Sequence, residues 1–182
     1  IELLSLRDLR ITFEAVECGK TFQENSEIKA KVYGNLSGLV TLADDSGLSV
    51  DSLNGDPGVR SARYGGDGLS DEDRVQLLLK NMREIPSSER NARFIAVLTL
   101  FIPNDKKSNN KLISIAGTCD GIIADKPVGS NGFGYDPIFY VPSLGKTTAQ
   151  ISSLEKDSIS HRGKALKKMR IEVQKLYNKN ND

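Results

Sequence analysis

The chain has 182 residues, of which 38% are hydrophobic and 27% charged, and its formal net charge is +1. This length predicts one domain with a full hydrophobic core, and the near-neutral charge argues against a nucleic-acid or membrane surface. The single histidine and the distant cysteines Cys18 and Cys119 are too few for a zinc site or a disulfide framework. With no visible signal peptide or membrane segment, we expect a cytoplasmic protein whose metal, if any, is a hard cation such as Mg²⁺.

The N-terminal region predicts three elements in chain order. Ile1–Leu6 has the character of the end of a helix, and Ile11–Val16 reads as a short strand. The spacing of polar residues in Thr21–Glu24 is that of a capping box. It predicts a helix that runs to about Tyr33 and ends at Gly34.

An apolar run followed by adjacent acids forms the most informative stretch. Leu39–Ala43 predicts a buried strand, Asp44-Asp45-Ser46-Gly47 follows, and Leu48–Val50 predicts a second short strand. Neighbouring side chains of a strand point to opposite faces, so one acid should face a site and the other should brace a loop or helix end. Acids at the end of a buried strand are typical of ligand sites in α/β sheets. Asp, Ser and Gly are also ordinary turn residues, and on this stretch alone a tight turn is favoured.

The remaining chain alternates helical and strand patterns, with an antiparallel strand pair at its centre and a lysine-covered helix at its end. The predicted elements are a helix over Asp71–Met82 capped by Ser70, a strand over Ala92–Ile102, a hairpin loop over Pro103–Asn110, strands over Lys111–Thr118 and Gly121–Ala124, an apolar stretch over Pro137–Val141, and a helix over Ser160–Asn178.

Polar clusters outside these periodic segments carry the functional signal. They are Asp44-Asp45-Ser46-Gly47, the stretch from Ser130 to Pro137, Glu155-Lys156, and Ser160-His161-Arg162 at a predicted helix start. A helix N-terminus and basic side chains suit phosphate, aromatic rings suit a flat base, and a carboxylate can hold magnesium or accept a proton from water.

Each cluster also has an ordinary structural interpretation. Phe133 and Tyr135 could belong to a packed loop, His161 could cap its helix, and Lys156 and Arg162 could be surface charges. The glycines before Phe133 do not form a P-loop, because no Gly-Lys-Ser/Thr follows them. The joint occurrence of the clusters therefore carries the nucleotide hypothesis.

Taken in order, several segments resemble the inosine triphosphate pyrophosphatase family, the HAM-type house-cleaning enzymes. The matching segments are Thr21–Asn25 with Lys29-Ala30, Ala43–Leu48, Pro57-Gly58, Ser61–Tyr64, Gly132–Phe139, and Lys156 with Ser160–Gly163. The resemblance implies one ITPase-like domain over residues 1–182, with an elongated α/β fold, a mixed sheet flanked by helices, and a cleft between two lobes. It implies hydrolysis of ITP, dITP or XTP to the monophosphate and pyrophosphate, with Mg²⁺ as cofactor and a homodimer as the assembly.

The resemblance also implies roles for individual residues. It makes Asp45 the proton acceptor and a magnesium ligand. Glu17 is the nearest candidate for a second magnesium ligand, with Glu14 behind it. The implied substrate contacts are Ser46, the base-binding loop Phe133, Gly134, Tyr135 and Asp136, and then Lys156, His161 and Arg162, with His161 and Arg162 near the base.

Alternatives to this function remain open at the sequence level. Family members begin with a strand and a Ser/Thr-Gly-Asn…Lys phosphate loop, and this chain starts just after the place where that loop should be. One alternative is a Maf-like nucleotide pyrophosphatase with another base specificity, and a second is an inactive nucleotide-binding remnant.

Overall fold

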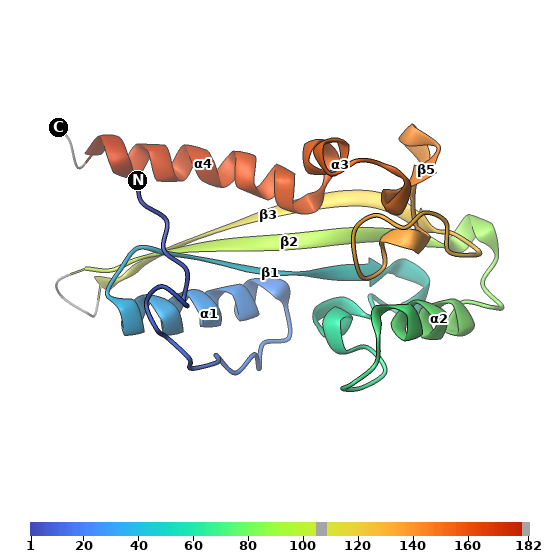
Figure 1. Ribbon diagram of the computed structural model, residues 1–182, viewed down its shortest axis with the longest axis horizontal. Helices are drawn as coiled ribbons and strands as arrows, with labels where there is room; N and C mark the ends of the chain where they lie inside the picture. The colour runs from blue at the N-terminus through green and yellow to red at the C-terminus, as the bar shows by residue number, and fades with distance from the viewer. Residues whose placement is uncertain (105–108, 180–182) are drawn as a thin grey trace.

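A computed structural model describes residues 1–104 and 109–179 of the chain (Figure 1). Its sheet has five strands in the order β1-β2-β3-β4-β5, and every pairing in the described residues is antiparallel. The strands are β1 (Thr41–Val50), β2 (Asn91–Ile102), β3 (Lys111–Ile123), β4 (Phe139–Val141) and β5 (Lys146–Thr147). The helices are α1 (Phe22–Ser37), α2 (Asp71–Asn81), α3 (Ser153–Ile159) and α4 (His161–Lys179). The predicted α/β class is confirmed, although the resemblance implied a mixed sheet.

Helices lie on both sides of the three long strands (Figure 1). Helix α4 runs along β2 and β3 on one side, and α1 packs on β1 and β2 on the other. Helix α2 lies beyond the end of β1. Among the described residues, no helix is long and apolar enough to cross a membrane.

The predicted helix over Ile1–Leu6 and the predicted strand over Ile11–Val16 are both wrong. Residues 1–20 contain neither helix nor strand, and most of their apolar side chains are exposed. The segment is instead attached to α1, because the amide of Ala15 donates to the hydroxyl of Tyr33 at 3.1 Å. Residues 11–16 make no strand pairing in the described structure, so strand propensity alone does not form a strand there.

The capping box that begins α1 is confirmed, but the predicted helix end is wrong. Thr21 and Glu24 make both reciprocal contacts, and α1 continues through Gly34 to Ser37 before Gly38 ends it with φ 69°. Gly34 lies inside the helix and packs against Phe101 of β2. A side chain at this position would not fit, because a Cβ there would overlap the ring of Phe101. The glycine serves close packing between α1 and β2, not termination.

The turn interpretation of the acidic stretch is also wrong. The acids lie in the middle of the single ten-residue strand β1, where Asp44 is opposite Leu98 and Gly47 is opposite Ile95 of β2. The strand begins only at Thr41. The long apolar partner strand provides continuous pairing through the polar residues, and this outweighs their turn preference.

The later elements follow the sequence predictions more closely. Ser70 caps α2 and α4 starts at His161, as expected, whereas the two predicted strands after Lys111 join into one strand, β3. Residues 105–108 of the predicted hairpin loop lie outside the described residues. Helix α3 was not predicted, although its capping box at Ser152 and Glu155 is visible in the sequence.

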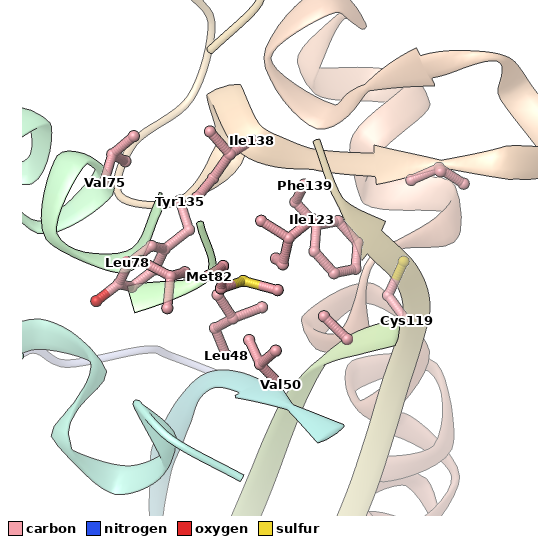
Figure 2. Packing of buried hydrophobic residues seen from close by; sticks show 12 residues of the cluster. Leu48, Val50, Val75, Leu78, Met82, Cys119, Ile123, Tyr135, Ile138 and Phe139 are labelled. Carbon is pink, nitrogen blue, oxygen red and sulfur yellow. The ribbon is translucent and has the colours of Figure 1, made fainter. Parts of the chain in front are cut away.

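Three hydrophobic clusters form among the described residues, and the smallest of them, Ala30, Ala43 and Phe101, packs between α1 and the sheet. Alternate β1 residues Leu48 and Val50 pack with Leu78 of α2, with Met82 directly after α2, and with β3 and β4 (Figure 2). Further along the sheet, Ala96, Leu98 and Leu100 of β2 pack with Ala165 and Met169 of α4. By the register of β1 and β2, Asp44 and Ser46 lie on the face that carries the two larger clusters. They therefore lie between the α2 core and the α4 core.

Candidate active site

A cavity of roughly 180 Å³ lies beside Ser46. Its walls come from β1, β2, the turn before α2, the starts of α2 and α4, α3, and the loop before β4. The lining residues are Ser46, Gly47, Ser61, Ala62, Asp71, Arg74, Phe94, Phe133, Gly134, Tyr135, Asp136, Lys156, His161 and Arg162. Eight of the ten residues predicted as site residues therefore meet at one cavity; Asp45 and Glu17 are not among its lining residues.

Arg162 is held at the cavity wall by one face of β1. Its Nε donates to Asp44 Oδ2 at 2.8 Å, and its Nη2 donates to Ser46 Oγ at 2.8 Å. Asp44 and Ser46 share this face because they are two residues apart. The expectation that one of the paired acids braces a helix end is confirmed for Asp44, which fixes the first turn of α4.

Buried side chains hold the loop from Phe133 to Asp136 in place. Asp136 is 1% exposed and accepts from the amide of Phe133 at 2.9 Å, and its Oδ2 also pairs with Lys156. The hydroxyl of Tyr135 donates to the carbonyl of Ser61 at 3.0 Å, and burial raises the pKa of that hydroxyl. These side chains hold the loop, which leaves the 65% exposed ring of Phe133 as the free aromatic surface.

Positive charge surrounds that ring. Lys156 Nζ lies 4.9 Å from the ring centre of Phe133, and the guanidinium carbon of Arg162 lies 5.8 Å from it. A flat aromatic face flanked by cations can take up an anionic ligand that has a planar group.

His161 is an uncharged wall of the same cavity. Its ring stacks on Phe94 with centroids 5.0 Å apart and an interplanar angle of 13°. Burial, followed by the positive charge of Arg162, lowers its pKa to about 4. At neutral pH the imidazole is therefore neutral, with one nitrogen to donate and one to accept a hydrogen bond.

Asp45 belongs to a second polar group, on the opposite face of β1. Its Oδ1 accepts from Lys29 Nζ of α1 at 2.7 Å, and the same ammonium lies 3.0 Å from Glu17 Oε1. Glu17 is held near α1 because the amide of Gly19 donates to Asn25 Oδ1 at 2.8 Å. Lys29, Asp45 and Glu17 are called the acid group below.

Within the acid group, Lys29 only partly offsets the effect of burial on the pKa of Asp45. Burial raises the pKa of Asp45, and the hydrogen bond and charge of Lys29 oppose that shift without reversing it. Burial works to lower the pKa of Lys29, yet contacts with both carboxylates raise it above its usual value. Burial therefore decides the direction for Asp45, whereas the two neighbouring carboxylates decide it for Lys29.

The acid group fits a hard divalent cation. Among the described residues, no cluster of three or more His, Cys, Asp or Glu side chains could hold a metal. Magnesium is commonly bound by only one or two carboxylates together with substrate phosphates and water. Asp45 Oδ2 is buried and has no hydrogen-bond partner in the described residues, which leaves an oxygen available for such an ion.

Comparison with known proteins identifies the family. The Ham1 family model matches residues 1–172. This chain belongs to the Ham1 family. The predicted membership in the HAM-type family is thereby confirmed.

Individual Ham1 relatives are similar over most of the chain. A dITP/XTP pyrophosphatase of Bacillus cereus is 43% identical over 173 residues, which is 95% of this chain and 83% of that protein. The solved structure of the Staphylococcus aureus Ham1 protein has a TM-score of 0.85 and 39% identity, and the match covers 95% of this chain and 86% of that one. A HAM1 protein from Coxiella burnetii has a TM-score of 0.81 and 42% identity, with 88% and 80% covered.

Several residues of this Ham1 chain were missed by sequence reasoning. Lys29 was part of a matching segment but received no role, although it follows Ser26 by three positions on a helix face that is turned to the sheet. Arg74 lines the cavity and pairs with Asp71 three positions earlier. The sequence gives no signal for Asp71 and Phe94 at this cavity, because Asp71 contacts Gly134 and Phe94 contacts His161, both far away in sequence. No local pattern reveals such contacts.

Proposed function

We propose that this Ham1-family chain hydrolyses the non-standard purine nucleoside triphosphates ITP, dITP and XTP to the monophosphate and pyrophosphate. The observation that carries the proposal is the position of Asp45 and Ser46. These neighbours on β1 join a cation-rich cavity on one face to an acid group on the other. A relative over most of the chain is named a dITP/XTP pyrophosphatase, which supports this substrate class.

In the proposed complex the base occupies the cavity. Phe133 covers the base, and Ser46, Lys156, His161 and Arg162 contact the nucleotide. Ser46 and Asp45 are neighbours on β1, and in this complex the phosphates extend from Ser46 across β1 to the acid group. Lys29 there supplies a positive charge for the phosphates.

The base preference has a chemical reason. Hypoxanthine and xanthine carry an acceptor oxygen at C6, where adenine carries a donor amino group. A cavity that directs donors at this oxygen leaves them unpaired when adenine binds, and unpaired buried donors reject a ligand strongly. Guanine shares the C6 oxygen, so its exclusion needs a further contact near its 2-amino group.

The proposed hydrolysis is an attack of water on the α-phosphorus. Asp45 accepts the proton of the water, the new P–O bond forms, and the bond from the α-phosphorus to the bridging oxygen breaks to release pyrophosphate. A raised pKa brings a carboxylate closer to the operating pH, which suits a proton acceptor. Asp45 and Glu17 would hold Mg²⁺, which neutralises phosphate charge when bound.

A substrate panel tests this function. With Mg²⁺ present, pyrophosphate release from ITP, dITP and XTP should exceed release from ATP by at least about a hundredfold in kcat/KM. Preference for a pyrimidine nucleotide would favour the Maf-like alternative. Binding of ITP without turnover would favour the inactive remnant, and equal turnover of ATP would contradict the specificity.

The assembly is a separate proposal. The resemblance implies a homodimer in the cytoplasm, and light scattering on the purified chain at micromolar concentration should give twice the monomer mass. A monomer mass at that concentration would contradict the dimer.

A further inference from the structure

Two consecutive amides of the loop above the cavity are each bound by a carboxylate. The amide of Phe133 donates to Asp136 at 2.9 Å, and the amide of Gly134 donates to Asp71 Oδ2 at 2.8 Å. The first contact is local, because Asp136 belongs to the loop itself. The second joins the loop to the first residue of α2, 63 positions earlier in the chain.

The carboxylate of Asp71 is oriented by its own helix. Arg74 Nη1 contacts Asp71 Oδ1 at 3.1 Å, which leaves Oδ2 directed at the amide of Gly134. Asp71 and Arg74 both line the cavity. The side chain of Arg74 is only 14% exposed, whereas that of Asp71 is 56% exposed, so the buried arginine is the fixed member of the pair.

The loop depends on such external contacts at this point. Gly134 has φ 59°, a backbone conformation open to few residues other than glycine, and the preceding ring of Phe133 is mostly exposed. Packing therefore holds the tip of the loop weakly. The contact with Asp71 connects that tip to a helix whose own start is fixed by Ser70 and Asp73.

We propose that Asp71 is a positioning residue for nucleotide binding: its carboxylate, oriented by Arg74, holds Gly134 so that Phe133 covers the base. The inference rests on the proposed function, in which this cavity takes the base. Asp71 acts through the loop and touches no reacting atom, so its loss should weaken binding and leave the chemical step unchanged.

The test compares three variants of the full chain with the wild type in steady-state hydrolysis of ITP. Asp71→Ala should raise KM by about tenfold, the usual scale for a hydrogen bond to a charged group, with kcat within about twofold of the wild type. Asp71→Asn keeps one acceptor oxygen for Gly134 but loses the acceptor that faces Arg74, and it should restore part of the affinity lost in Asp71→Ala. Glu72→Ala removes an exposed carboxylate from the same helix turn and should behave as the wild type.

A second measurement needs no substrate. Hydrogen exchange of the Gly134 amide, followed by NMR in the free protein, should be faster in Asp71→Ala than in the wild type and Glu72→Ala. Equal KM for Asp71→Ala and the wild type would overturn the inference. So would an Asp71→Asn variant as impaired as Asp71→Ala, because that result would assign the effect to charge at the helix start. A wild type that hydrolyses none of the purine triphosphates would instead refute the proposed function.

Discussion

The single histidine of the chain, His161, has an environment unlike that of a surface histidine. It is 8% exposed, stacked on Phe94 and adjacent to the cation Arg162. Its neutrality lets it line the cavity without adding a buried charge of its own. The neutral state also links the stability of the fold to pH.

The pH dependence of folding should report this histidine directly. The pKa of His161 is about 4 in the folded protein and 6.5 ordinarily, so between these values only the unfolded chain binds the proton. The free energy of unfolding should therefore be fully retained above pH 6.5 and fall by about 3 kcal/mol as the pH drops toward 4.

Urea denaturation of the wild type and of His161→Asn at several pH values across this window measures the effect. No other histidine contributes, because the chain has only one. In the variant, the free energy of unfolding should fall less steeply as the pH drops, because the imidazole no longer contributes to its pH dependence. An identical slope in both proteins would contradict a buried neutral His161.

The two acids proposed for a second magnesium ligand also differ at this scale. Glu17 lies 3.0 Å from Lys29 in the acid group, whereas Glu14 is exposed. We expect Glu17→Gln to raise the Mg²⁺ concentration for half-maximal activity by about tenfold. Glu14→Gln is the matched control, and an equal effect of both substitutions would contradict the assignment of Glu17.

Among the elements, α4 positions two site residues relative to the sheet. Its first turn carries His161 and Arg162, and it approaches β3 closely at Gly117. A Cβ at Gly117 would overlap the carbonyl oxygen of His161 and lie 2.6 Å from the amide nitrogen of Ala165. The glycine therefore sets the depth at which the helix start enters the cavity.

A substitution at this contact should affect stability and binding together. Gly117→Ala should lower the free energy of unfolding by about 2 kcal/mol, as overpacking commonly does, and should raise KM by displacing the first turn of α4. Thr118→Ala, at the exposed neighbouring position, should change neither quantity. Urea denaturation and ITP kinetics measure both effects, and an unaltered Gly117→Ala protein would contradict the close approach.

Whether a helix or strand could be predicted from the sequence depends on whether its own residues carry the signal. Helices α1 and α2 carry capping boxes and β2 is mostly apolar, with β-branched and aromatic residues, so local signals are enough to predict that these elements form. The polar centre of β1 and the glycine inside α1 could not be read locally. Their states depend on β2, which pairs with β1 and places Phe101 against Gly34.

The whole molecule places a polar site between two apolar cores on one face of a sheet. Motifs far apart in sequence could be assigned to a common site because they occur together, and eight of the ten predicted residues meet at the cavity. The sequence predicts that Asp44 and Asp45 face opposite sides of their strand, but it does not predict which side each of them faces. That depended on whether helix α1 or α4 covers each face, a property of the tertiary fold.

Asp45→Asn tests the central claim most directly, since it removes the proton acceptor while keeping the shape of the side chain. Pyrophosphate release from ITP is measured with Mg²⁺, and Asp51→Asn, at an exposed ion pair just after β1, serves as the control. We predict that kcat falls by roughly a hundredfold to ten-thousandfold in Asp45→Asn and is unchanged in Asp51→Asn. Turnover by Asp45→Asn at the wild-type rate would contradict the claim that hydrolysis takes place at the acid group of β1.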